Sequence, residues 1–209
     1  MSNQKNNPLQ VAENKVGVKS HPALIATARI QLRPLEVKDA ETVFIYRNQP
    51  DVSLFQGWTP ESIAEVAAYA EQMWQREPAL AGHWYQVVLE GREGEIKNKI
   101  IGDVAFCIEP HSGQQAELGV ALNVDYQRKG LAKEAILGLL AYLFEQLAMH
   151  RIHVCIDPRN VRSLNLFQKV GFRHEGHHRQ SCWHKGEWTD DVVMAMLRSE
   201  WPDIKLSAE

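Results

Sequence analysis

The segment QRKGLA at residues 127–132 has the residue types and the position of a phosphate-binding loop. It lies between a run with strand periodicity and a run with helical periodicity, where free backbone N–H groups meet the positive end of a helix dipole. Small residues at Gly130 and Ala132 let phosphate oxygens approach the main chain, and Arg128 and Lys129 add positive charge. The predicted ligand is a diphosphate, and the alternative is an ordinary basic turn. The candidate residues are Gln127, Arg128, Lys129, Gly130, Leu131 and Ala132.

A second pattern follows, with Asn160, Ser163 and Phe167 in succession and Gly171-Phe172 after them. The order and spacing of the two patterns resemble the GNAT superfamily of acyltransferases. Within that superfamily, three further stretches resemble the RimJ/RimL-like ribosomal-protein N-terminal acetyltransferases. These stretches are Leu32-Arg33-Pro34-Leu35, Ala116-Glu117-Leu118-Gly119 and Gly186-Glu187-Trp188-Thr189-Asp190, and the resemblance spans residues 28–201.

The resemblance implies acetyl-CoA as co-substrate, with its diphosphate on residues 127–132. Its pantetheine arm is expected beside the preceding strand, at Leu122, Asn123 and Val124. Relatives also use the positions of Asn160 and Phe167 near the cofactor. The oxyanion of the reacting carbonyl is expected to meet backbone N–H groups near Ala121 or Leu122. No metal is implied.

The catalytic side chains depart from the family's pattern. Many relatives place a proton-donating tyrosine where this chain has Phe167, so Ser163 becomes the candidate acid, unless its hydroxyl only bonds the carbonyl four residues earlier. Some relatives carry a glutamate where this chain has Cys155, so Glu117 becomes the candidate base, unless it is merely a solvated strand residue. An α-amine, with a pKa of about 7.7–8.0, needs less help from a base than a lysine at about 10.4.

The amine that accepts the acetyl group is expected to lie between the first helices and the last hairpin. Phe55, Trp58 and Trp188 are the candidate walls, although loop tryptophans also serve as core plugs. The resemblance favours the N-terminal α-amine of a protein, such as a ribosomal protein. The alternatives are a small amine (a polyamine, an amino acid derivative or an aminoglycoside) and a catalytically silent acyl-CoA-binding module.

The elements that position these residues predict an α/β (α+β) fold, with a mixed, strongly twisted sheet of about seven strands and about four helices. The predicted strands are 29–33, 84–89, 100–108, 116–124, 151–157 and a hairpin of 172–184 and 190–198 around Lys185-Gly186. The predicted helices start at Asp39, at Thr59-Pro60, at residue 131 (ending near 147) and at Asn160. The segment 116–157 should form a right-handed parallel crossover, and the sheet should splay after the strand at 116–124.

Length and composition limit the remaining possibilities. The 209 residues fit one domain at 27–201, preceded by an arm at 1–26 and followed by a tail at 202–209. A formal net charge of −3 argues against nucleic acid as the main partner. The absence of a secretory h-region and of a membrane-length apolar run predicts a cytoplasmic protein, as a monomer or homodimer. Alternating His174, His178, Cys182 and His184 do not match a zinc signature, so no metal is expected.

Overall fold

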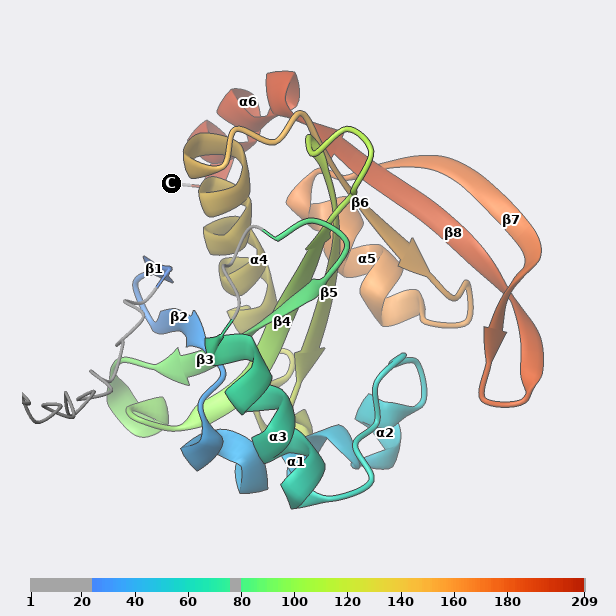
Figure 1. Cartoon of the computed structure of the whole chain (residues 1–209). Coiled ribbons are helices and arrows are strands. Elements are labelled where there is room, and N and C mark those ends of the chain that lie inside the picture. Colours follow the sequence, from blue (N-terminus) through green and yellow to red (C-terminus); the bar gives the residue numbers. More distant parts are fainter. Residues whose placement is uncertain (1–23, 76–79, 209) are drawn as a thin grey trace, which may run out of the picture.

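The structure, a computed structural model, describes residues 24–75 and 80–208 and is built on one eight-stranded sheet (Figure 1). The strand order is β1-β2-β3-β4-β5-β6-β8-β7, and only the β5–β6 pair is parallel. The strands are β1 (Ile25–Ala26), β2 (Ile30–Pro34), β3 (Trp84–Gly91), β4 (Ile100–Ile108), β5 (Gln115–Leu122), β6 (Arg151–Ile156), β7 (Arg173–His184) and β8 (Glu187–Leu197). The predicted mixed sheet and parallel crossover are confirmed.

The additional strand is β1, which the sequence placed in the N-terminal arm. Ile25 and Ala26 pair with Leu32 and Gln31 of β2, because the turn between them is closed by the Thr27 N–H bonding to the Ile30 carbonyl at 2.8 Å. The rest of the predicted arm, residues 1–23, lies outside the described residues.

Six α-helices occur in the described chain, two more than predicted. They are α1 (Ala40–Arg47), α2 (Pro50–Ser53), α3 (Ile63–Trp74), α4 (Leu131–Ala141), α5 (Val161–Val170) and α6 (Trp201–Ala208). The short α2 and the terminal α6 are the additions, and α6 takes up most of the predicted tail. The predicted helix 131–147 is α-helical only to Ala141 and continues as a π-helical turn at Tyr142–Gln146.

One predicted helix start is wrong, whereas the start predicted at Asp39 is confirmed, because Asp39 is the N-cap residue of α1. Helix α3 begins at Ile63 and not after Thr59-Pro60, because the Ser62 hydroxyl accepts the Glu65 N–H at 3.1 Å. Asp39 precedes α1, but its carboxylate makes no cap bond to that helix. It instead accepts two bonds from the Arg33 guanidinium, at 2.7 and 2.8 Å, and so ties the helix start to β2.

The helices cover the two faces of the sheet with separate apolar clusters. Helix α4 packs against β2, β4, β5 and α5, over the face that carries Ala116 and Leu118 of β5. Helices α1 and α3 pack on the opposite face, where Val88 and Ala121 belong to their cluster. The second face is covered only in part, because α1 and α3 lie over one end of it (Figure 1).

Strands β5 and β6 separate after three paired positions, from Gln115–Arg151 to Glu117–His153. β5 then continues to Leu122, paired on its other edge with β4, while β6 continues to Ile156, paired with β8. The predicted splay is confirmed, but it starts within the strand, at Leu118, and not after its end. One backbone edge of β5 therefore faces an opening in the sheet.

Candidate active site

The backbone of β5 beyond Glu117 is the first part of the candidate site. The Val120 carbonyl accepts a hydrogen bond from Gln56 Nε2 at 3.2 Å, and the Leu122 carbonyl accepts one from Gln127 Nε2 at 3.0 Å. Because backbone groups alternate in direction along a strand, Leu118, Val120 and Leu122 direct theirs toward the opening. This edge matches what a chain of amides, such as pantetheine, requires for strand-like pairing.

The same alternation corrects the predicted oxyanion contact. The Asn123 N–H donates to the Ile101 carbonyl of β4 at 3.1 Å, so the odd-numbered positions face β4. Ala121 therefore directs its N–H away from the opening, whereas Leu122 directs its N–H into it. Of the two predicted positions only Leu122 fits the geometry, and Val120 is the fitting neighbour that the sequence missed.

Asn123 and Val124 lie beyond the end of β5, in a turn of 3-10 helix. Gln49 holds both: its Nε2 donates to Asn123 Oδ1 and its Oε1 accepts the Val124 N–H, each at 3.2 Å. The Asn123 side chain also accepts the Asp125 N–H at 3.2 Å. The structure thus shows these two predicted cofactor residues engaged in shaping the turn, and the edge of β5 that β6 leaves uncovered ends at Leu122.

The loop at residues 127–132 has the conformation that a phosphate site requires. Gly130 caps α4 with a left-handed φ of 77°, and a Cβ atom built on it would meet only Arg29 Nη2, at 3.5 Å. The Glu134 N–H donates to the Gly130 carbonyl at 3.1 Å, so the N–H groups of residues 131–133 have no acceptor within the helix. Leu131 is buried, and therefore only its backbone is available to a ligand. A diphosphate fits this end of α4.

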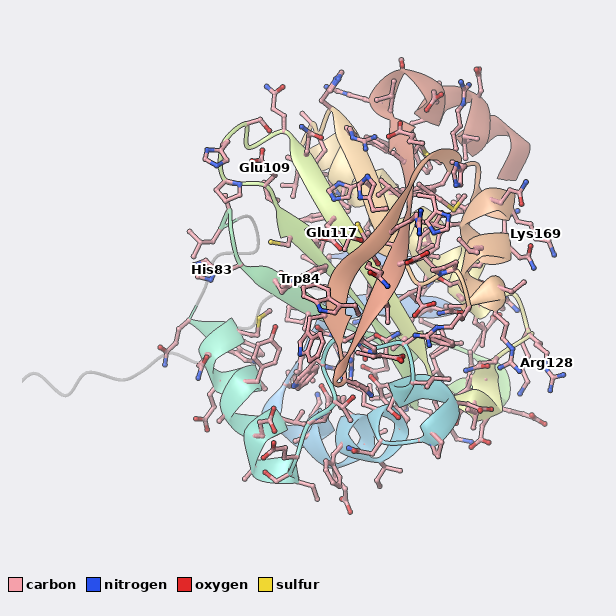
Figure 2. The ribbon with its side chains drawn as sticks, turned by 90° about the vertical axis from the view of Figure 1, so that its right-hand side faces the viewer. His83, Trp84, Glu109, Glu117, Arg128 and Lys169 are labelled. Atoms are coloured by element: carbon pink, nitrogen blue, oxygen red, sulfur yellow. The ribbon has the colours of Figure 1, made fainter. Side chains whose placement is uncertain are left out.

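The cations around the loop have different surroundings. Lys129 turns back, with its Nζ 2.8 Å from the Asp125 carbonyl and 5.6 Å from the Tyr126 ring centroid. Arg29, which the sequence did not single out, pairs with Glu134 at 2.7 Å and donates to the Lys129 carbonyl at 3.2 Å. Arg128 is exposed, and Figure 2 shows it at the same edge of the molecule as Lys169 of α5. Arg128 is therefore the cation best placed to meet a phosphate.

Helix α5 brings two predicted residues to the opening. Asn160 caps the helix, with its Oδ1 accepting the Ser163 N–H at 3.1 Å. Ser163 is half-buried, and its hydroxyl makes no hydrogen bond with any residue that the structure describes. The alternative, a hydroxyl bonded to the carbonyl four residues earlier, is thus not observed. The Ser163 O–H keeps its capacity to donate.

Phe167 lies one turn further along α5 but points into the core. Its side chain is 2% exposed, and its ring packs edge-to-face on Phe172 with the centroids 5.1 Å apart. The structure therefore gives this predicted cofactor residue a packing role. Helical periodicity explains the difference, because Phe167 and Val170 share the buried face of α5.

Glu117 lies at the last paired position before β5 and β6 separate, and Figure 2 places it mid-sheet, behind the β7–β8 hairpin. Burial, and then the charge of Asp191, raise the pKa of Glu117. Within the described residues neither carboxylate forms an ion pair, although Asp191 accepts a bond from the Ser181 hydroxyl at 3.3 Å. Asp191 is a functional candidate that the sequence analysis did not identify. The alternation of residues along β8 does not show that Asp191 lies near Glu117 of β5.

Two other titratable groups share this face of the sheet. Burial and the neighbouring Glu117 and Asp191 raise the pKa of Cys155 to about 11, so its thiol stays protonated near neutral pH. Burial and Arg151 lower the pKa of His153, which therefore stays neutral. Cys155 is thus excluded as the base, whereas Glu117 and the neutral His153 beside it on β6 can each accept a proton.

The three predicted acceptor residues lie on two elements that meet above this face. Phe55 and Trp58 belong to the loop after α2, whereas Trp188 is on β8, 58% exposed and 5.3 Å from the Trp183 ring. The hairpin tip contacts that loop, because Lys185 Nζ donates to the Ser53 carbonyl at 2.6 Å. Trp58 is half-buried, and Phe55 is too. The predicted residues thus lie on the two elements, the loop after α2 and the last hairpin, between which the acceptor is expected.

Residues 24–75 and 80–208 contain no group of three or more side chains arranged to hold a metal ion. Over the same residues, no helix has both the length and the apolar character needed to cross a membrane.

Comparison with known proteins decides the family. Residues 29–173 match the acetyltransferase (GNAT) domain. The chain belongs to the GNAT acetyltransferase family. It is similar to the N-acetyltransferase YnaD of Bacillus subtilis (strain 168), with 30% identity over 85% of this chain and 98% of the relative. This GNAT protein is accordingly an acetyl-CoA-dependent N-acetyltransferase.

The fold and two named relatives complete the comparison. A crystal structure of a GNAT-family acetyltransferase from Bacillus anthracis superposes with a TM-score of 0.71 and 27% identity, over 84% of this chain and 99% of that one. The [ribosomal protein uS5]-alanine N-acetyltransferase of Escherichia coli (strain K12) is 32% identical over 50% of this chain and 55% of its own. The spermidine N(1)-acetyltransferase of the same strain is 22% identical over 82% of this chain and 88% of its own.

Proposed function

We propose that this GNAT acetyltransferase acetylates the N-terminal α-amine of a protein, such as a ribosomal protein. The diphosphate of acetyl-CoA binds the loop at residues 127–132, and the pantetheine arm pairs with Leu118–Leu122. Glu117 accepts the proton of the amine, directly or through a water molecule. Ser163 donates a proton to the departing thiolate.

The two substrates approach Glu117 from different sides. In Figure 2, Glu117 lies near Trp84, which is two strands away at the start of β3, whereas Arg128 of the proposed phosphate loop lies toward the right-hand edge. The β5 edge leads from that loop toward Glu117, so a thioester at the end of pantetheine lies beside this carboxylate. Positioning of the two reactants contributes most of the rate in such a site.

The transfer forms one bond and breaks one. The amine nitrogen bonds to the thioester carbonyl carbon while one N–H group on the open edge of β5, that of Val120 or of Leu122, binds the developing oxyanion. The carbon–sulfur bond then breaks and leaves an amide. An ammonium acceptor first loses one proton to solvent, through Glu117. The neutral amine then attacks, and its nitrogen loses a second proton to Glu117. The thiolate gains a proton from Ser163, and Ser163 recovers its proton from solvent.

The modest strength of the available base carries the proposal of an α-amine acceptor. Glu117 is a carboxylate, and Cys155, at the position where some relatives have a glutamate, stays protonated because its pKa is about 11. Transfer of a proton to a carboxylate is less unfavourable from an α-amine with a pKa of about 7.7–8.0 than from an alkylamine near 10.4, and more of the α-amine is already neutral near pH 7. The similarity to a ribosomal-protein alanine N-acetyltransferase agrees with this acceptor.

A small polyamine is the second candidate. Glu117 and Asp191 lie close enough for the charge of Asp191 to raise the pKa of Glu117, and no described cation pairs with either. Two such carboxylates attract a polycation. The similarity to a spermidine N(1)-acetyltransferase agrees with that acceptor.

A competition assay distinguishes these acceptors. The enzyme is given acetyl-CoA with N-terminal peptides, blocked peptides carrying only lysine amines, polyamines and aminoglycosides, and thiol release is measured. We expect the free N-terminal peptides to be preferred, with kcat/KM rising as the pH approaches the pKa of the α-amine. Release with polyamines alone would show that the peptide proposal is wrong. Asp191→Asn would then raise the KM for the polyamine.

The phosphate loop gives a prediction on cofactor affinity. Arg128→Ala should weaken acetyl-CoA binding by about 1–2 kcal/mol, because one charge-assisted contact to phosphate is lost. Gly130→Val should weaken binding more, because a β-branched residue is strained at a φ of 77° and narrows the approach to the backbone.

Isothermal titration calorimetry measures both variants, with Lys38→Ala as the control: it removes an exposed cation that pairs with Glu36, away from the end of α4. An unchanged dissociation constant in both Arg128→Ala and Gly130→Val would exclude this loop as the diphosphate site.

A further inference from the structure

Arg47, in the last turn of α1, is a buried arginine whose guanidinium hydrogen-bonds both strand β4 and the loop after α2. Its Nε donates to Asp103 Oδ2 at 2.9 Å and its Nη2 donates to Asp103 Oδ1 at 2.5 Å, so β4 holds it by a two-pronged ion pair. Its third nitrogen, Nη1, donates to the Trp58 carbonyl at 2.9 Å. The guanidinium carbon also lies 4.7 Å from the centroid of the Trp58 ring, in cation–π geometry.

Asp103 is the fixed point of this arrangement. Its side chain is 1% exposed, and it accepts further hydrogen bonds from the Tyr46 hydroxyl and from Gln86 Nε2. Burial and the charge of Asp103 raise the pKa of Tyr46, so that the phenol stays protonated and donates. A carboxylate with donors on both oxygens cannot turn, and it therefore fixes the orientation of Arg47.

Stability alone does not account for this ion pair. Removing two charges from water costs about as much as their attraction returns, and apolar replacements of similar volume are often equally stable. One donor of Arg47, Nη1, bonds the Trp58 carbonyl in a loop and not a group in the core. The pair thus provides orientation more than stability.

The loop that Arg47 holds, residues 53–59, contacts two elements that border the proposed reaction site. Gln56 Nε2 donates to the Val120 carbonyl on the open edge of β5 at 3.2 Å. On the other side, Nε2 of His184, at the tip of the β7–β8 hairpin, lies 3.0 Å from the Leu54 carbonyl of the loop. The 53–59 loop therefore connects the open strand edge to the last hairpin, and Trp58 is its best-anchored aromatic residue.

Trp58 also contacts residues of helix α3 on this face. Its ring lies 5.0 Å from the Tyr69 ring, and its Nε1 donates to Glu65 at 3.0 Å. The Tyr69 hydroxyl donates to the Trp84 carbonyl at 3.4 Å. Trp58 and Tyr69 thus form an aromatic pair that is bonded to the backbone at the start of β3.

We propose that Arg47 is a positioning residue, which fixes Trp58 and the 53–59 loop as one wall of the acceptor site. The inference rests on the proposed function in one respect, that the acceptor binds on this face. Arg47 does not touch either substrate, and it acts through Trp58. Its loss should consequently affect the acceptor and spare acetyl-CoA.

The central test is Arg47→Lys, which retains a charge near Asp103 but loses the planar fork that spans Asp103 and Trp58. We expect the KM for the acceptor amine to rise about tenfold, as expected for a lost hydrogen bond to a charged group, with the KM for acetyl-CoA unchanged. The acceptor is the best amine from the competition assay. Trp58→Leu should reproduce this pattern. Trp58→Phe, which keeps an aromatic ring, should raise the KM for the acceptor less than Trp58→Leu does.

Arg33→Lys is the matched control. Arg33 is also buried and pairs with Asp39 at 2.7 Å, but none of its hydrogen bonds or ion pairs within the described residues reaches the 53–59 loop. If Arg47→Lys fails to fold, the double variant Arg47→Met with Asp103→Asn removes both charges. It leaves an amide oxygen that accepts from Gln86 Nε2 and an amide N–H that donates to the Tyr46 hydroxyl oxygen. We expect that variant to fold and to show the same KM pattern.

Hydrogen exchange gives a readout that does not depend on the acceptor. Amides at residues 53–59 should exchange faster in Arg47→Lys than in the wild type, while Arg33→Lys leaves them unchanged. Unchanged exchange there, or equal increases in both KM values, would overturn the proposal. A wrong acceptor class is recognised separately, because the competition assay then selects another amine while the exchange result stands.

Discussion

Replacing Glu117 by glutamine should lower kcat by about 10²–10³-fold, the usual effect of losing a general base. Glutamine has nearly the same shape but cannot accept the proton of the amine. The site is not expected to unfold, because within the described residues Glu117 forms no ion pair that the substitution would break. The dissociation constant for acetyl-CoA should stay near the wild-type value. Steady-state kinetics with the preferred amine, together with calorimetry, measures both quantities.

The pH dependence provides a second criterion for Glu117. Burial and Asp191 raise its pKa, so the carboxyl holds its proton to a higher pH than an exposed glutamate does. A protonated carboxyl cannot act as base, and kcat should therefore rise with pH as Glu117 ionises. In Glu117→Gln this acidic limb should disappear. Asp191→Asn should move the limb to lower pH, because it removes the neighbouring negative charge.

Glu109→Gln is the control for the Glu117 variant. Glu109 lies in the turn between β4 and β5, where its carboxylate accepts the N–H groups of His111 and Ser112 (Figure 2). Its substitution should leave kcat unchanged. An equal loss in both variants, or an unaltered pH profile in Glu117→Gln, would show that Glu117 is not the base.

Replacing Ser163 by alanine should lower kcat by about 10²-fold without changing acetyl-CoA affinity. The Ser163 hydroxyl makes no hydrogen bond in the described part of the chain, and the cap of α5 uses the Ser163 N–H, which alanine retains. Alanine is also a good helix former. The loss should thus reflect the missing proton donor and not a damaged helix.

The chemistry of the leaving group separates a proton donor from a structural role. With a thioester whose thiol is more acidic, protonation matters less, so the deficit of Ser163→Ala should shrink. Ser163→Thr, which retains a hydroxyl, should have a higher kcat than Ser163→Ala. A deficit of the same size with every thioester would refute the acid role, and so would an unchanged kcat with acetyl-CoA. Solvent water would then be the proton source.

Local sequence determined the parts of this protein that depend on neighbours along the chain. The turn into α4 at the proposed phosphate loop follows from its small residues, and Gly130 takes a left-handed conformation there. The caps of α5 follow from Asn160 and Gly171, and the hairpin turn follows from Lys185-Gly186, both with positive φ. These features, and the order of strands and helices that predicts the parallel crossover, need no information about distant contacts.

Tertiary structure alone decided which groups face the reaction site. The direction of the β5 backbone at Val120 depends on its pairing with β4, and the burial of Phe167 depends on how α5 lies on the sheet. Asp191 acquires its place beside Glu117 only when β8 packs next to β6. The Arg47–Asp103 pair joins residues far apart in sequence, and a single arginine in a helix does not reveal such a partner. Long-range contacts of this kind depend on the packing of the whole chain, which short-range periodicity does not determine.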